Sequence, residues 1–481
     1  MDQASAAAGA QESEDRNGET GTGTGSAGKG SIAHTHAQGL GEEQSIWFKL
    51  GVLTRQDDPI PALQRISEKM GGCIRVNLKD ERIFFLSEVD HFKHVLLNKV
   101  DNYGKYFEGL KPIFGRAMIT IDGALWQKIR MPQQAAFQPK MFGEYLPYLL
   151  AAVEEKALDL EQFAKTGETI NLLEHTWGLA ASMVCKALFD RDVPFNPKAV
   201  FGAVKSYTDV GHHRDLRLAK VKGDLTEVSL DDPAAGAVAA WLKLIPEVVG
   251  AVPRDHRQRT LLTMLQAAAA DPNQPDFDDQ QVLDEVKQYL WAGTETTALT
   301  LTWCLYLLHL HPEVAERIRQ EGEDAYGTRV PSWDDIHALS YTRAVIQETM
   351  RLYPPVWSII RVALAEDEIS GHKVMPGDKV ALCPYIVHHT ARYWDEPEKF
   401  DPSRFMPEKA KKRAPYSYVP FGAGKRACIG GALSIAENTL ALTQLLRKFR
   451  FEYMGEVPAR MDATVTLTPR GGALPFRVHT R

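Results

Sequence analysis

Cysteine is scarce in this chain and is spaced too widely to build a covalent framework. Five cysteines occur among 481 residues, and no two of them form a Cys-x-x-Cys pair. Disulfide scaffolds and structural zinc sites need several closely spaced cysteines, so we exclude both. An odd number of isolated thiols is typical of a protein from a reducing compartment. We therefore expect a soluble, cytoplasmic protein.

Long apolar runs and a strong charge of one sign are also missing. No apolar stretch reaches the roughly 18 residues that a transmembrane anchor needs, so we expect none. The net charge is −6 and the sequence pI is about 6.2. Such mild acidity predicts neither a nucleic-acid partner nor binding to an anionic membrane. We expect a monomer.

Residues 1–42 differ in composition from the rest of the chain. They are rich in Ala, Gly, Ser, Thr and Glu, as in the run Gly18–Gly25. Such a segment buries too little apolar area to offset the entropy of ordering, which predicts a disordered tail. It is either a solvated leader or a segment that docks on a partner. Residues 43–481 contain no repeat or linker and are expected to form one large unit.

Helical periodicity dominates this unit, and short alternating patterns interrupt it. Helices are expected from about residue 123 and at 144–163, 173–190, 197–208, 235–250, 278–310, 312–325, 341–352 and 429–447. Hairpins are expected at 74–85, 362–380 and 464–478. The pattern predicts a mainly α fold with a small β region.

The longest helical pattern, residues 278–310, contains an unusual polar segment. Its second half is apolar on most of its surface, so the helix is expected to pass through the middle of the protein. Ala292–Thr297, with the sequence Ala-Gly-Thr-Glu-Thr-Thr, interrupts this pattern. Glycine and consecutive hydroxyls weaken a helix interior. The segment is therefore either a bend with a satisfied polar patch or a functional site.

The segment Phe421–Gly430 is the most informative in the chain. It reads Phe-Gly-Ala-Gly-Lys-Arg-Ala-Cys-Ile-Gly. Two glycines before Cys428 allow a tight turn, and a helix is expected to start directly after it. The amides and dipole of a helix start lower a thiol pKa and favour the thiolate. Taken alone, such a cysteine is more often structural.

The full spacing Phe-x-x-Gly-x-Arg-x-Cys-x-Gly changes that balance, because it resembles the signature of the cytochrome P-450 family, the haem-thiolate monooxygenases. Phe421, Gly424, Arg426, Cys428 and Gly430 fill every fixed position. The resemblance covers roughly residues 45–481. It implies the cytochrome P-450 fold, a single α-rich unit that encloses haem b, with Cys428 as the iron ligand and dioxygen as co-substrate.

The resemblance also implies which residues bind the cofactor: Trp126, Arg130, Arg361, Phe421, Arg426, Cys428 and Gly430. Trp126 and Arg130 lie four residues apart on one helix face, where the family binds a haem propionate. The same pair also fits an aromatic–cation contact on a surface helix. Arg361 and Arg426 match further propionate partners by position, since buried carboxylates need cations.

Two more groups of residues follow from the resemblance. In the central helix, Thr296 would donate a hydrogen bond to the dioxygen ligand, and Glu295 would relay protons from solvent. Glu348 and Arg351 form a Glu-x-x-Arg pair, which by itself is usually a surface ion pair. With Arg404, from a Pro-x-x-Phe-x-Pro-x-Arg-Phe stretch, they would form a buried scaffold that supports the fold and haem uptake.

The substrate is less well specified. The candidate pocket residues are Tyr106, Phe107, Phe114, Tyr289, Ala292, Val356 and Trp357. Most are apolar or aromatic, so they fit a small apolar substrate that resembles a fatty acid, a terpenoid or a polyketide. Aromatic residues at helical spacing are also typical of ordinary core packing, and that interpretation remains open.

No flavin or iron–sulfur domain is expected after Cys428, so NAD(P)H electrons would come from a ferredoxin or flavodoxin-type donor with its reductase. A basic surface could bind an acidic donor, or it could be a solvated loop; its residues are Lys409, Lys411, Lys412, Arg413 and Lys425. The expected reaction is hydroxylation or epoxidation. A haem-thiolate peroxygenase or isomerase and a non-catalytic haem sensor are the alternatives.

Overall fold

The computed structural model describes residues 60–78, 81–107, 110–192, 242–243, 245–246, 248–250, 260–463 and 465–481. The tail expected at residues 1–42 and the helix expected at 197–208 lie outside these residues. The helix expected at 235–250 is described only in part.

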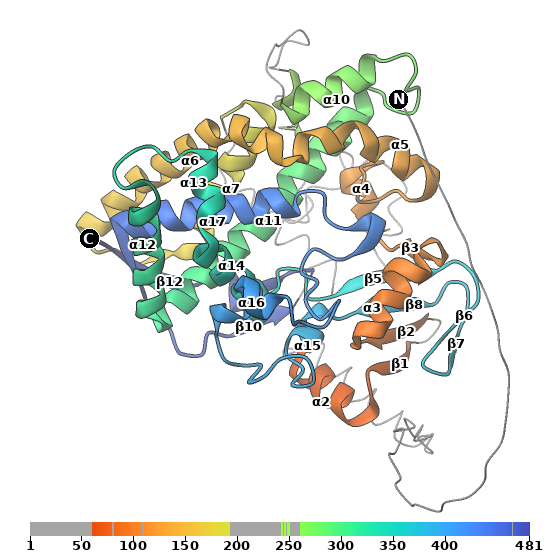
Figure 1. Ribbon diagram of the computed structural model, residues 1–481. Coiled ribbons are helices and arrows are strands. Elements are labelled where there is room, and N and C mark those ends of the chain that lie inside the picture. The colour runs from red at the N-terminus through yellow and green to blue at the C-terminus, as the bar shows by residue number, and fades with distance from the viewer. Residues whose placement is uncertain are drawn as a thin grey trace, which may run out of the picture.

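Helices make up most of the described chain, and short strands complete it. The helices are α2 Ile60–Met70, α3 Val89–Lys93, α4 Lys111–Phe114, α5 Gly123–Gln133, α6 Pro139–Thr166, α7 Leu172–Phe189, α10 Leu261–Ala270, α11 Asp279–Leu310, α12 Pro312–Tyr326, α13 Trp333–Ala338, α14 Ser340–Leu352, α15 Pro384–His388, α16 Pro407–Ala410 and α17 Gly431–Lys448. The strands are β1 Cys73–Leu78, β2 Glu81–Leu86, β3 Tyr103–Lys105, β4 Ile170–Asn171, β5 Ile359–Ala363, β6 Asp367–Ile369, β7 His372–Val374, β8 Lys379–Leu382, β9 Phe449–Tyr453, β10 Met461–Ala463, β11 Leu467–Pro469 and β12 Pro475–Thr480. The expected mainly α fold is confirmed (Figure 1).

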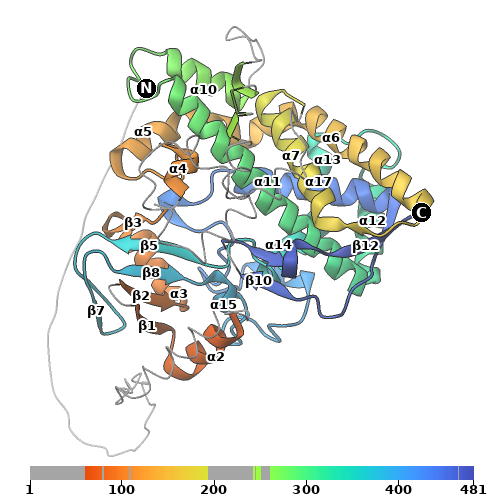
Figure 2. The ribbon, with the colours of Figure 1, turned by 180° about the vertical axis from the view of Figure 1, so that it is seen from behind.

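Helix α11 is the centre of the helical part. The Asp278 side chain caps it by accepting a hydrogen bond from the Gln281 amide at 2.8 Å, and it ends before Pro312, as expected. Apart from its ends and the segment around Ala292–Thr296, most of α11 is buried. It packs against α7, α10, α14 and α17, and Figure 2 shows it running through the helical part beside α7.

A five-stranded sheet lies beside the helices, with the order β1-β2-β8-β5-β3 (Figure 1). β2 and β8 are parallel, whereas the other neighbouring strands are antiparallel. The short β3 pairs with β5 so that Lys105 lies opposite Arg361. This register places two cations side by side at the edge of the sheet.

The hairpins expected at 74–85 and 362–380 are confirmed, as β1–β2 and as β6–β7 within the β5–β8 connection. The closing hairpin expected at 464–478 is wrong. β11 pairs with β10, whereas β12 pairs with β9 and β4 in another sheet. Gly471 and Gly472 both have positive φ, and the turn that they form directs β12 away from β11.

The described residues contain neither a disulfide nor a membrane-spanning helix. All five cysteines lie in the described part of the chain, and they form no disulfide there. Among the helices that the structure describes, none is long and apolar enough to cross a bilayer.

Candidate functional site

The loop before α17 folds back on itself around Cys428. The Cys428 amide donates to the Phe421 carbonyl at 2.9 Å and closes the loop. Gly424 has a φ of +70°, and a Cβ at this position would lie 2.3 Å from the Leu96 carbonyl oxygen. Only glycine fits this position. Arg130 of α5 donates to the Ala427 carbonyl at 3.2 Å and so ties α5 to the loop.

The Cys428 sulfur lies at the start of α17. Burial raises the pKa of the Cys428 thiol, while hydrogen bonds from the Gly430 and Gly431 amides and the nearby Arg130 charge act against this rise. The expected lowering by the helix start is thus present, but burial outweighs it. The Cys428 side chain nevertheless has accessible surface. A sulfur that is both accessible and desolvated faces a space inside the protein.

The middle of α11 also has accessible surface on an otherwise buried helix. Ala292, Gly293, Glu295 and Thr296 are all partly accessible. The Thr296 hydroxyl donates to the Ala292 carbonyl at 2.8 Å. A Cβ on Gly293 would lie 2.9 Å from the Val184 side chain, so glycine lets α7 approach closely. Open space therefore lies beside the polar segment of α11.

A cation group lies where β3, β5, α5 and the Cys428 loop (residues 421–430) meet. It consists of Lys105, Arg130, Arg361 and Arg426. Arg426 pairs with Asp122 at 2.5 Å, and its side chain is 5% exposed. Lys105 and Arg130 lie 5.2 and 5.3 Å from the centre of the Trp126 ring. The Arg361 side chain is buried as well.

The charges in this group do not balance. Burial is the largest cause that lowers the pKa of Lys105, to about 7, and Asp122 opposes it. The charges of Arg361, Arg426 and Arg130 lower the pKa of Lys105 further. Burial followed by the Arg426 charge likewise lowers the pKa of Arg361, to about 10. Because Asp122 is the one carboxylate among these interactions, the group is short of negative charge.

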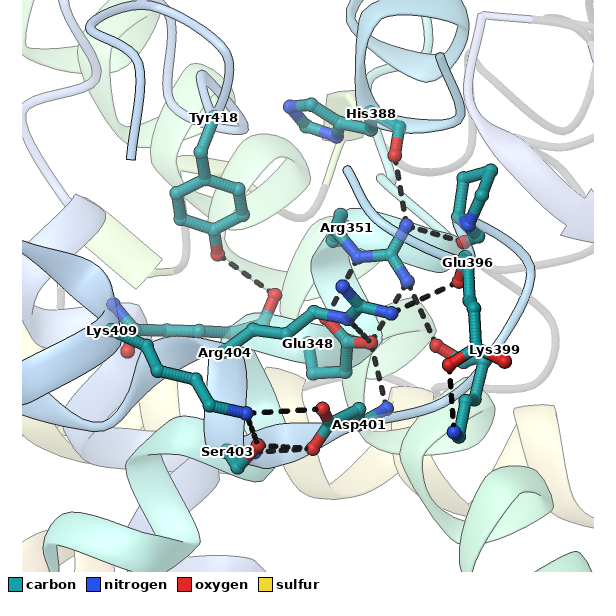
Figure 3. A network of polar contacts seen from close by, with 12 residues as sticks. Glu348, Arg351, His388, Glu396, Lys399, Asp401, Ser403, Arg404, Lys409 and Tyr418 are labelled. Atoms are coloured by element: carbon teal, nitrogen blue, oxygen red, sulfur yellow. Dashed lines mark hydrogen bonds and ion pairs between the residues drawn. The ribbon is translucent and has the colours of Figure 1, made fainter. Parts of the chain in front are cut away.

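Glu348, Arg351 and Arg404 come together as expected, in a buried network (Figure 3). Arg351 donates two hydrogen bonds to the Glu348 carboxylate, at 2.7 and 2.8 Å, and both side chains are fully buried. The Arg404 Nε lies 3.5 Å from Glu348. Arg351 also donates to the carbonyls of His388 and Pro397, at 2.8 and 2.6 Å. The Glu348–Arg351 pair therefore connects α14 to the segment 388–404. Because both side chains are buried, the pair is not a surface ion pair.

Comparisons with known proteins agree with this geometry. The family model of cytochrome P450 matches residues 41–476. The chain belongs to the cytochrome P450 family. Cyclooctatin synthase of Streptomyces melanosporofaciens is 30% identical over 413 residues, which cover 83% of this chain and 87% of the relative. Cyclooctat-9-en-7-ol 5-monooxygenase of the same organism is 29% identical over 79% of this chain and 82% of its own. The crystal structure of cytochrome P450 CYP102L1 has the same fold, with a TM-score of 0.76 at 22% identity, over 88% of this chain and 98% of that chain.

The chain is thus a P450 monooxygenase, and haem is the cofactor of this family. The residues present fit that group. Haem carries two propionates, and the cation group lacks negative charge. The Nε atoms of Arg361 and Arg426 are buried without a hydrogen-bond partner in the described residues, as expected of donors that await an anion. The accessible Cys428 sulfur has the chemistry of a haem ligand.

The P450 pocket residues expected from the sequence divide into two groups. Ala292, Phe107 and Val356 keep accessible surface, and so does Tyr106, which accepts a hydrogen bond from Lys379 at 2.6 Å. The other three are packed: Phe114 stacks on Trp291 at 5.1 Å, Tyr289 stacks on Phe137 at 5.4 Å and Trp357 is buried in a cluster with α2 and β1. The Tyr289 hydroxyl also donates to Gln133 of α5.

The basic surface expected near Cys428 is smaller than the sequence predicts. Arg413 does not belong to it, because its guanidinium lies 4.4 Å from the Phe405 ring in a cluster that also contains Tyr418. Burial lowers the pKa of Arg413 accordingly. Lys425 pairs with Asp101, and Lys411 and Lys412 are exposed.

Three residues that contact the expected site residues were not predicted from the sequence. Lys105 lies at the site because β3 pairs with β5 in this register. No local sequence motif predicts that pairing. Asp122 accepts from the Gly123 amide at the start of α5, so its position before Gly123 was a capping signal. Thr466 donates to Glu295 at 2.7 Å across 171 residues of sequence, and nothing local indicates this.

Proposed function

We propose that Cys428 holds the haem iron through its thiolate. The Gly430 and Gly431 amides that hydrogen-bond the sulfur would stabilise its negative charge, and Gly424 gives the loop its tight turn. A metal cation deprotonates a coordinating thiol, so it would reverse the effect of burial on the Cys428 pKa. Phe421 and Gly430 border the same loop and would contact the haem face.

We infer that the cation group binds the haem propionates. Arg361 and Arg426 would each complete their hydrogen bonding with a carboxylate oxygen. Arg130 and Lys105 flank the Trp126 ring and would add positive charge on the same side. Glu348, Arg351 and Arg404 would support this arrangement as a structural network rather than take part in the reaction.

Thiolate-bound haem supplies the cleavage of the dioxygen O–O bond. In our proposal the chain itself delivers the protons. The Thr296 hydroxyl donates to the Ala292 carbonyl at 2.8 Å, and it would exchange this hydrogen bond for one donated to dioxygen. Glu295 immediately precedes Thr296 on α11 and is partly accessible. It would therefore bring protons from solvent towards Thr296.

The proposed substrate is a small apolar molecule, of fatty-acid, terpenoid or polyketide type, that is hydroxylated or epoxidised. Ala292, Phe107 and Val356 offer accessible apolar surface, which supports such a substrate. One relative is named as a 5-monooxygenase of cyclooctat-9-en-7-ol. Water held away from such a pocket would favour the reaction.

Electrons are proposed to come from NAD(P)H through a ferredoxin or flavodoxin-type donor and its reductase. Lys411 and Lys412 are exposed between α16 and the Cys428 loop and would attract an acidic donor. The isolated cysteines favour a reduced, cytoplasmic setting for this chemistry.

The decisive experiment compares the haem spectra of the wild type with those of C428A. The reduced, carbon monoxide-bound wild type should show the red-shifted Soret band of a thiolate-ligated haem, and C428A should lose it. C73A is the matched control, since Cys73 lies in β1 and outside the loop, and it should keep the band. An unchanged spectrum in C428A would refute the assignment.

A second measurement tests the reaction class. Turnover with NAD(P)H, a ferredoxin and its reductase should exceed turnover with hydrogen peroxide alone. Faster turnover with peroxide would make the protein a peroxygenase instead. T296A should consume NAD(P)H and release more hydrogen peroxide, and full coupling in T296A would contradict the role of Thr296.

A further inference from the structure

A hydroxyl from a distant part of the chain holds the acid next to Thr296. Thr466 lies between β10 and β11, and its Oγ1 donates to the Glu295 Oε1 at 2.7 Å. Thr466 is only 4% exposed, whereas Glu295 keeps accessible surface. At this contact Thr466 is therefore shielded from solvent, whereas Glu295 remains accessible to it.

The turn that carries Thr466 is itself fixed to α11. The Trp303 indole of α11 donates to the Leu467 carbonyl at 3.1 Å. The Leu467 amide donates to the Pro355 carbonyl at 3.0 Å, and the Leu467 side chain is fully buried. The neighbour of Thr466 is thus held from two directions, and one of them is the helix that carries Glu295. These contacts therefore fix the position of the Thr466 hydroxyl.

A glutamate in the middle of a helix has several rotamers, and an accessible one can turn towards bulk water. A hydrogen bond to a charged carboxylate is among the stronger ones in proteins, so it selects one rotamer. Proton transfer requires donor and acceptor within hydrogen-bonding reach, directly or through one water. The orientation of Glu295 therefore decides whether it can serve Thr296.

We propose that Thr466 is a positioning residue for proton delivery: its hydroxyl orients the Glu295 carboxylate beside Thr296. The inference rests on the proposed proton-delivery roles of Glu295 and Thr296. Oxidation of a substrate consumes two electrons and two protons per dioxygen and yields one oxygenated product and one water. When protons arrive too late, the same two electrons and two protons leave as hydrogen peroxide.

The test needs no knowledge of the substrate. Without one, dioxygen takes either four electrons and four protons to give two waters, or two of each to give hydrogen peroxide. The holoprotein is supplied with NADPH, a plant-type ferredoxin and its reductase, and hydrogen peroxide is measured per NADPH. T466V, which keeps the shape but removes the donor, should raise the ratio of peroxide to water by a factor of about ten. T466S should restore the wild-type ratio.

Two controls separate positioning from folding. T468V removes a hydroxyl of equal burial on β11 that donates to the Asp462 carbonyl instead, and it should leave the ratio unchanged. In an E295Q background, T466V should add no further effect, because its partner is already neutral. Equal effects of T466V in both backgrounds would overturn the proposal.

A spectroscopic measurement on the resting holoprotein is independent of turnover. Infrared difference spectra against E295Q report the protonation of the Glu295 carboxyl. Loss of a donor to the carboxylate should favour the protonated form of Glu295 in T466V. An unchanged protonation of Glu295 together with an unchanged peroxide ratio would also overturn the proposal. Failure of the proposed function would appear differently, as a wild type without the thiolate spectrum.

Discussion

Lys105 lies among cations that outnumber the carboxylates around them. It lies directly opposite Arg361 on the neighbouring strand, an arrangement that destabilises a sheet when the charges are alike. Burial lowers the pKa of Lys105 to about 7, and Asp122 only partly offsets this. An anion placed between these cations would raise the Lys105 pKa and stabilise the β3–β5 pair. Haem propionates would do this.

We therefore expect K105Q to bind haem more weakly. Loss of one charge-assisted contact should speed haem loss by about tenfold, as measured by haem transfer to apomyoglobin. K128Q is the control, because Lys128 lies on α5 with a side chain 64% exposed and pairs with Asp276 instead. Equal rates of haem loss in K105Q and the wild type would show that Lys105 does not contact the cofactor.

Substitutions at Gly422 and Gly424 distinguish the cost of backbone strain from the cost of a steric clash in the Cys428 loop. Both have positive φ, at +69° and +70°. A Cβ on Gly422 would meet only Ile359, at 3.8 Å, whereas a Cβ on Gly424 would lie 2.3 Å from the Leu96 carbonyl oxygen. G422A should thus lower the free energy of unfolding by about 1–2 kcal/mol through strain alone.

G424A should be far worse, because the backbone of η1 (His94–Asn98) cannot yield easily. We expect it to abolish haem incorporation during expression. Urea unfolding and the haem content of the two purified variants check the difference. Similar losses in both variants would mean that close approach to Leu96 is unimportant.

At the scale of elements, α11 holds the segment that joins α4 to α5. The Glu285 carboxylate accepts from the Met118 amide at 2.7 Å and from the Gln281 side chain at 2.8 Å. Met118 in turn accepts from Lys105 at 2.6 Å through its carbonyl. Burial raises the pKa of Glu285 to about 8, although these hydrogen bonds act against it. A neutral Glu285 thus links the central helix to the cation group.

This link predicts that shape and hydrogen bonding matter at Glu285, while charge does not. E285Q keeps the acceptor for Met118 and Gln281 but sets an NH2 group against the Gln288 side chain, which donates to the second Glu285 oxygen at 3.0 Å, so it should lose about 1 kcal/mol at pH 7. E285L leaves the Met118 and Gln281 donors buried without an acceptor, so it should lose about 2–4 kcal/mol. Urea unfolding of both variants measures this. An equal loss in E285Q would mean that the carboxylate is ionised in the folded protein.

Elements with a strong pattern were predictable, and contacts set by tertiary register were not. The ends of α11 and α14 follow from apolar periodicity and from the prolines after them, whereas the extent of α17 follows from apolar periodicity alone. The Glu348–Arg351 pair was predicted because both residues lie on one helix turn. Lys105 could not be found, since its place depends on how β3 pairs with β5. The hairpin expected at 464–478 failed because strand alternation does not specify a partner strand.

At the scale of the whole molecule, the site is assembled from segments far apart in the chain. Lys105, Trp126, Arg361 and Cys428 belong to four separate elements or loops, which only the complete fold brings together. Buried titratable groups lie on other elements: Glu285 on α11, Glu437 on α17 and His389 at the end of α15. Burial raises the pKa of Glu437 to about 8, as it does for Glu285, and lowers the pKa of His389 to about 3. Stability should therefore fall on both sides of an optimum.

The loss of stability at low pH and the loss at high pH have opposite causes. His389 is neutral in the folded protein, so its contribution is present above its ordinary pKa of about 6.5 and is lost as the pH falls towards 3. Glu285 and Glu437 hold their protons in the folded protein. Their contribution is present below their ordinary pKa of 4.5 and is lost as the pH rises through about 8. Each group adds at most about 1.4 kcal/mol per pH unit.

Replacing both acids with their neutral amides isolates the loss of stability at high pH. The E285Q/E437Q protein cannot lose these protons, so its free energy of unfolding should gain on that of the wild type from pH 5 to pH 8.5. Urea titrations of the haem-free proteins at half-unit steps give the difference curve, in which unaltered groups such as His389 cancel. A difference that does not vary with pH would mean that the two carboxyls titrate normally, and that burial leaves them solvated.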